Sequence, residues 1–129
     1  MASQGYGTDV TEIAGADLSA AQFLAVKLTS TGLVIAGAGD FALGILQNKP
    51  ANGQAATVRI DGKSKFVAGG AVTKGALLAS DAAGKAKAAT AGATTSSNVI
   101  AQATEAAAGA GQIIGVYLTR AGAVPTTNA

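Results

Sequence analysis

The sequence predicts an all-β protein folded as a single compact β-barrel or β-sandwich domain. Short runs rich in β-branched and apolar residues follow one another at regular spacing, and glycine-rich turns separate them. The chain has 129 residues, the usual size of one domain, so we expect no second folded unit. The stretch EAAAGAG, which begins at Glu105, has a helical composition in its first four residues, but glycines end it within about one turn.

The chain is expected to divide into an N-terminal arm at residues 1–13, a β-rich domain at residues 14–120 and a C-terminal tail at residues 121–129. The arm is polar and contains glycine, which favours a flexible segment, and the tail is expected to fray. Three isolated apolar residues stand in the arm and are its candidate contact residues: Tyr6, Val10 and Ile13.

Residues 16–32 are open to two interpretations. Ser19 followed by Gln22 is a capping-box pattern typical of a helix start. The alternation of larger apolar residues with Ala, Lys and Thr across residues 24–29 is instead typical of a half-buried strand. We favour a short turn followed by a strand, because Ser-Thr-Gly closes the run after a few residues.

The middle of the chain is expected to contain two strands, a turn and a β-hairpin. The strands cover residues 33–36 and 41–47, and Lys49 to Gly53 form the turn, because Pro50 lacks an N–H and Asn-Gly favours positive φ. The dipeptide Asp61-Gly62 is a strong hairpin signal, so its flanking runs are expected to pair with each other. Those runs are residues 56–60 and 63–67.

The C-terminal half is expected to hold four further strands. The first two bracket a turn with the sequence Asp-Ala-Ala-Gly, and a low-complexity loop at residues 90–98 precedes the last two. The four strands are expected at residues 76–80, 85–89, 99–105 and 112–119.

The core is expected to be thin and to need a partner. Only 28 of the 129 residues are Leu, Ile, Val or Phe, and the net charge of +2 is too small to favour disorder. The chain has no Cys and no His, so disulfides are excluded and a metal site is not expected. Oligomerisation or docking on a larger partner is then the general route to extra stability.

The residue types argue against catalysis and against a cofactor. Without His or Cys, the common general base, the thiol nucleophile and the usual zinc ligands are missing. Most carboxylates stand in predicted turns or in the arm, where Asp is favoured for its hydrogen bonds to the backbone. Residues 37–42, GAGDFA, match a dinucleotide-binding fingerprint, but that fingerprint needs a helix and the residues that follow alternate as a strand.

Nucleic-acid binding and membrane insertion are also not expected. Lys63 and Lys65 beside Phe66, with Arg59 across the predicted hairpin, could form an aromatic and basic surface. Lysines at a hairpin are more often solvated protection against edge-to-edge pairing. No apolar run is long enough to span a membrane, and the first residues lack the pattern of a secretory signal.

The order of several segments resembles the small capsid cement, or head decoration, proteins of tailed bacteriophages. The resemblance runs from about Ala16 to Leu118. It rests on "GILQNKPANGQAATVRIDG", then "AGGAVTKG", then "SDAAGKA", then a closing glycine-rich turn and an apolar strand, in that order.

The resemblance implies a β-rich, β-tulip-like fold and a structural role without enzymatic activity. It implies that the protein, made in the host cytoplasm, sits on the outer surface of the virion capsid. There it would bind the major capsid protein as a homotrimer and stabilise the shell, with no small-molecule substrate. The arm residues would be the capsid contacts. A virion fibre or a receptor- or glycan-binding attachment protein is the alternative, because it would share this composition.

Overall fold

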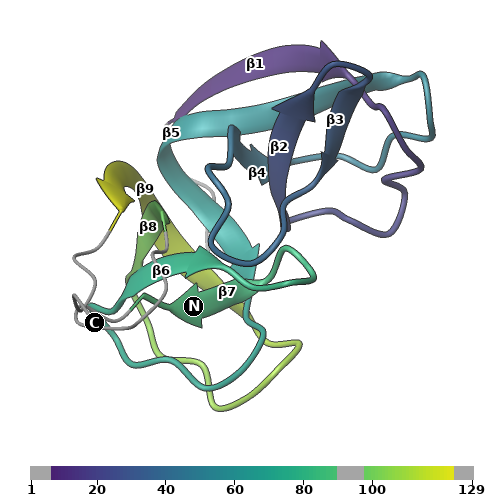
Figure 1. Cartoon of the computed structure of the whole chain (residues 1–129). Coiled ribbons are helices and arrows are strands. Elements are labelled where there is room, and N and C mark those ends of the chain that lie inside the picture. The colour runs from purple at the N-terminus through teal and green to yellow at the C-terminus, as the bar shows by residue number, and fades with distance from the viewer. Residues whose placement is uncertain (1–6, 90–97, 124–129) are drawn as a thin grey trace, which may run out of the picture.

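The computed structural model describes residues 7–89 and 98–123, and its nine strands form one strongly curled, antiparallel sheet (Figure 1). The all-β fold expected from the sequence is confirmed, and no helix occurs in these two ranges. The strands are β1 (Gly7–Ile13), β2 (Ala25–Thr29), β3 (Gly32–Ile35), β4 (Gly44–Leu46), β5 (Ala55–Val67), β6 (Leu77–Ser80), β7 (Ala86–Ala88), β8 (Asn98–Ala103) and β9 (Ile113–Ala123).

The strands divide into two lobes that share β5. The amino lobe, residues 7–61, pairs β3, β2, β4, the first part of β5 and β1 in that order. A parallel bridge between Ala14 and Leu33 brings the end of β1 back to β3, so this lobe curls almost closed. The carboxy lobe, residues 62–123, continues the sheet from the second part of β5 through β9, β8 and β6 to β7.

The predicted hairpin at Asp61-Gly62 is wrong, because both residues lie inside one 13-residue strand. The first part of β5 pairs with β1 and β4, and the second part pairs with β9, so the two runs never pair with each other. Gly62 has a φ of 92°, which only glycine adopts at little cost, and it pairs with both β1 and β9. Figure 1 shows β5 bending as it passes from one lobe to the other.

The folded domain extends past both of its predicted boundaries, residues 14 and 120. Residues 7–13 were expected in the arm, yet they form β1 and pair with β5 along their whole length. The strand β9 likewise extends to Ala123, inside the predicted tail. Pairing with a central strand orders both segments, which their polar or glycine-containing sequences do not indicate. The rest of the arm and tail, residues 1–6 and 124–129, lies outside the described residues. So do residues 90–97 of the loop predicted at 90–98, and the last residue of that predicted loop, Asn98, begins β8.

The described residues pack around two apolar cores built mostly from small side chains. The larger core packs β5, β6, β8 and β9 together around Phe66, which is fully buried, and it reaches into the amino lobe. Its amino-lobe members are Ala25, Ala36, Ala42 and Ile45. The smaller core lies between the amino-lobe strands and the segment at residues 14–24. Taken over the two cores together, nearly half of the buried residues are alanines, which agrees with the thin core expected from the sequence. The smaller core consists of Ala14, Leu18, Ala21, Leu24, Val26, Leu33, Leu46, Ala56 and Val58.

Candidate functional site

The apolar surface is the feature that stands out among the described residues. These residues enclose no pocket, and they hold no cluster of three or more acidic, His or Cys side chains that could bind a metal. None of their elements is a helix suited in length and hydropathy to crossing a membrane. Within residues 7–89 and 98–123, seven large apolar side chains are exposed: Ile13, Leu28, Ile35, Phe41, Leu77, Ile113 and Tyr117.

The three predicted contact residues do not form one surface. Tyr6 lies outside the described residues. Val10 is partly buried and packs against the smaller core, whereas Ile13 is 54% exposed at the end of β1. The two residues are three positions apart in one strand, so their side chains point to opposite faces of the sheet. Ile13 is therefore available for a contact, and Val10 contributes mainly to the fold.

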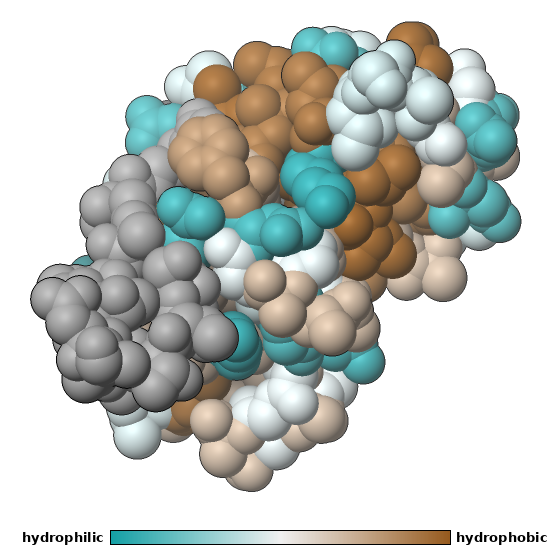
Figure 2. All heavy atoms as spheres, viewed as in Figure 1, coloured by the Kyte–Doolittle hydropathy of each residue, from teal (hydrophilic) through white to brown (hydrophobic). Residues whose placement is uncertain are grey.

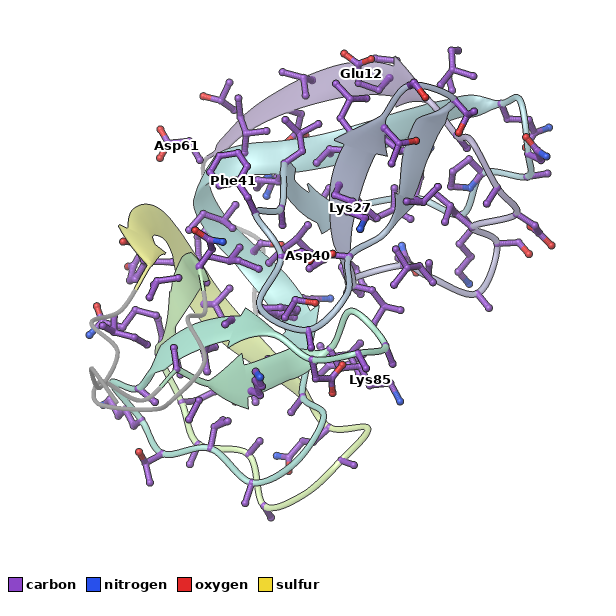
Figure 3. The ribbon with its side chains drawn as sticks, viewed as in Figure 1. Glu12, Lys27, Asp40, Phe41, Asp61 and Lys85 are labelled. Atoms are coloured by element: carbon purple, nitrogen blue, oxygen red, sulfur yellow. The ribbon has the colours of Figure 1, made fainter. Side chains whose placement is uncertain are left out.

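An apolar patch lies on the amino lobe, with two acidic residues beside it. Val10, Leu43 and Ile60 are partly exposed and pack against the same core, and Phe41, two residues before Leu43, is 65% exposed. We call these four residues the amino-lobe patch. Figure 2 shows hydrophobic residues gathered over this lobe. Figure 3 shows Asp61 on the same side as Phe41, and Glu12 farther along β1.

A second surface crosses four strands of the carboxy lobe. Lys63, Tyr117, Gln102 and Leu77 are paired neighbours on β5, β9, β8 and β6, so their side chains lie in one row on the face turned away from the core. Tyr117 is 53% exposed and Leu77 is 39% exposed. Lys65 on β5 and Ile113 on β9 extend the same face, because each lies an even number of positions from a member of the row. We call these six residues, from Lys63 to Tyr117, the carboxy-lobe face.

Sequence reasoning missed this face, although a signal was present. In β9, Ile113 and Tyr117 alternate with the buried Ile114, Val116 and Leu118. An apolar residue on the outer side of such an alternation is a candidate contact residue. The cross-strand register that places Leu77 in the same row is not visible in the sequence.

The lysines of the carboxy-lobe face lie over aromatic rings. The Lys63 Nζ is 5.7 Å from the centre of the Tyr117 ring, and the Lys65 Nζ is 5.5 Å from the centre of the Phe23 ring. Both distances fit cation–π contacts. Phe66 is fully buried, so it does not form the aromatic and basic surface considered from the sequence.

Arg59, also considered for that surface, forms an ion pair on the opposite lobe. Its Nε and Nη2 donate to the two carboxylate oxygens of Asp9 at 2.7 and 3.1 Å. Its Nη1 also donates to the carbonyl oxygen of Lys63 at 2.9 Å. The hydrogen bonds to Asp9 raise the pKa of Arg59 above its usual value. This pair joins β1 to β5 across a cross-strand position.

The segment that matched a dinucleotide fingerprint is a turn closed by Asp40. The Asp40 Oδ2 accepts hydrogen bonds from the Lys27 Nζ at 2.7 Å and from the Gly37 N–H at 2.8 Å. The bond from Lys27, followed by the bond from Gly37, lowers the pKa of Asp40 below its usual 3.8. No helix starts in this segment, so the geometry that meets a pyrophosphate is not formed.

Replacing Asp40 with asparagine is expected to destabilise the protein in a pH-dependent way. Because the pKa of Asp40 is lowered by folding, its ionised form stabilises the protein above the usual pKa of 3.8, and this contribution is lost as the pH falls through the lowered value. Both partners are about one third exposed, so the effect near neutral pH should be about 0.2–1 kcal/mol. Urea unfolding near neutral pH and near pH 2 measures it. Asp61→Asn, which removes no ion pair within the described residues, is the control, measured at the lowest practical protein concentration so that self-association contributes least to the stability. A stability difference between wild type and Asp40→Asn that persists at low pH would contradict this account.

Comparisons with known proteins identify the family. No curated protein matches the chain. One solved structure, described as "the crystal structure of head fiber gp8.5 N base in bacteriophage phi29", has a similar fold, with a TM-score of 0.65 and 19% identity over 89% of this chain and 96% of that chain. The family model described as "Phage cement protein" matches residues 3–119. This match covers nearly every strand described above, and the chain belongs to the phage cement protein family, whose members are non-enzymatic structural proteins of the phage capsid surface.

Proposed function

We propose that this protein binds the outer surface of a tailed-phage head as a homotrimer and stabilises the capsid by bridging subunits of the major capsid protein. The observation that carries this proposal is the cement-family match over residues 3–119. The thin core supports it, because a partner that binds only the folded state raises the stability of a weakly stable chain by mass action. Exposed apolar side chains on both lobes supply surface for such contacts.

The start of the chain is proposed as one of the capsid contacts. Ile13 presents an exposed side chain at the end of β1, next to the turn at Gly53, where Ala14 accepts a backbone hydrogen bond. Tyr6 and Val10 complete the proposed contact, with Val10 acting mainly by holding β1 on the core. An exposed isoleucine loses its unfavourable hydration when the shell covers it.

Co-sedimentation with heads that lack this protein tests the proposal. The protein is expected to bind at a fixed ratio to the major capsid protein and to raise the temperature at which the heads break. Ile13→Ser should weaken binding about three- to tenfold, since it removes roughly 1 kcal/mol of apolar burial. Leu28→Ser is the matched control, because Leu28 is 53% exposed on β2 and Ile13 is 54% exposed.

The outcomes separate the parts of this proposal. Absence of binding to any head would contradict the cement role. Equal binding by wild type, Ile13→Ser and Leu28→Ser would move the contact away from Ile13 while keeping the role. Light scattering on the same samples gives the oligomeric mass, and a mass other than three chains would contradict the trimer.

A second candidate function is the base of a head fibre or another virion attachment. It is favoured by the similarity to the phi29 head-fibre base, which covers 96% of that solved chain. In this role the protein would bind heads without making them more resistant to heat. Binding of the isolated protein to host cells or glycans would support attachment over stabilisation.

A further inference from the structure

The two halves of the chain carry opposite net charge. Residues 1–61 contain three basic and five acidic side chains, whereas residues 62–129 contain six basic and two acidic ones. Two of the acidic residues in the amino lobe are neutralised locally, Asp9 by Arg59 and Asp40 by Lys27. Glu12 and Asp61 form no ion pair within the described residues, and they stand on β1 and β5 beside the amino-lobe patch.

The carboxy-lobe face is also apolar, but basic rather than acidic side chains border it. Leu77, Ile113 and Tyr117 expose 39%, 44% and 53% of their surface on adjoining strands. Lys63 and Lys65 lie on the same face, and neither forms an ion pair with any described residue. An apolar surface bordered by two lysines that lack a carboxylate partner among the described residues fits a partner that is apolar and bordered by acidic side chains.

We propose that the carboxy-lobe face of one copy packs on the amino-lobe patch of the next copy, head to tail. This inference rests on the proposed homotrimer and names the surfaces that form it. In this arrangement Tyr117 and Ile113 cover Phe41 and Ile60, while the two lysines face Glu12 and Asp61 of the adjacent copy. Each copy uses both surfaces once, and the proposed homotrimer requires the contact to turn each copy by one third of a turn, which closes a ring of three.

Charge and composition favour this pairing over contact of like surfaces. A two-fold contact through the carboxy-lobe face would set lysines against lysines, and one through the amino-lobe patch would set carboxylates against carboxylates. The head-to-tail contact instead opposes unlike charges, which fixes orientation more than it adds affinity. The apolar residues supply most of the affinity, with Tyr117 suited to a central position because tyrosine is enriched among the residues that dominate binding.

Charge reversal on the full-length protein tests the pairing by sedimentation equilibrium. Lys63→Glu/Lys65→Glu and Glu12→Lys/Asp61→Lys should each weaken self-association about tenfold or more, because each sets like charges against each other. The variant with all four changes restores opposite charges and should associate within about threefold of wild type. Lys49→Glu/Lys74→Glu is the matched control, because both lysines are exposed outside the two surfaces and the net-charge change equals that of the first variant.

Each outcome decides the inference. Restoration by the variant with all four changes, with the control unchanged and circular dichroism confirming that every variant is folded, establishes the head-to-tail contact. Self-association that survives Lys63→Glu/Lys65→Glu, or that the four combined changes fail to restore, overturns it. A wild-type protein that binds heads as a monomer also overturns it while leaving capsid binding intact. Wild-type trimers that follow the charge pattern but bind no head would leave this contact standing and contradict the cement role.

Discussion

Replacing Phe66 with alanine is expected to lower the free energy of unfolding by about 3–5 kcal/mol. Phe66 is fully buried and is the largest side chain of the larger core, where its strand position pairs with Ile114. Its neighbours are mainly alanines, valines and isoleucines on strands that are hydrogen-bonded on both sides. Such a framework cannot collapse into the space left by a benzyl group, so the cost of the cavity adds to the lost burial.

Urea unfolding followed by circular dichroism measures this effect. The lowest practical protein concentration should be used, so that self-association contributes least to the apparent stability. Phe41→Ala is the matched control, because Phe41 is 65% exposed and its truncation should change the stability by less than about 1 kcal/mol. Equal losses from both substitutions would show that Phe66 does not organise the core as described.

Replacing Gly44 with alanine is expected to cost about 3 kcal/mol or more. Gly44 begins β4, which pairs with β2 on one side and β5 on the other. A Cβ at this position would collide with the carbonyl oxygen of Arg59 and would come within 2.9 Å of the Val58 Cγ1. The obstacle is the backbone of β5, which cannot rotate away, so β4 would have to separate from its partner.

The control for this substitution is another glycine of the same chain. A Cβ added at Gly70 would meet no heavy atom within 4 Å, and Gly70 has no positive φ, so Gly70→Ala is expected to be neutral or slightly stabilising. Thermal unfolding of both variants under one set of conditions compares them. A tolerated Gly44→Ala would mean that β4 and β5 approach less closely than the structure shows.

The separate strands could be predicted because they depend on local patterns. The alternation near Val26 and the apolar run around Leu78 predict strands wherever they lie, and the structure contains β2 and β6 there. The turn at Gly84 also needed only local information, since the Asp81 Oδ1 accepts hydrogen bonds from the N–H groups of Ala83 and Lys85. The family resemblance, which the comparison confirms, rested on the order of such local pieces.

The path of β5 could not be predicted from local patterns. Asp61-Gly62 favours a hairpin by its own preferences, but β1 and β9 supply partners on both sides of this dipeptide and keep it in a strand. The residues that supply these partners are about 50 or more positions away in sequence. Tertiary pairing therefore overrode the turn preference, as it also ordered residues 7–13, which looked like an arm.

The candidate surfaces, like the strands, could be predicted from the sequence only in part. The sequence marked Ile13 as apolar in a polar segment, and its exposure agrees with a contact role that remains a proposal. The sequence could not show that Val10 packs on the core while Ile13 is exposed, because the face of β1 that meets the core depends on the register of β1 with β5.

The sequence by itself determined the strand content, the thin core, the small net charge and the family. Only the tertiary structure decided which strands pair, which alternating side chains face solvent, and that Lys63, Tyr117 and Leu77 share one row. The physical reason is the distance along the sequence over which each kind of interaction acts. Strand and turn preferences act over a few neighbouring residues, whereas a surface made of paired strands is assembled from backbone hydrogen bonds between distant segments.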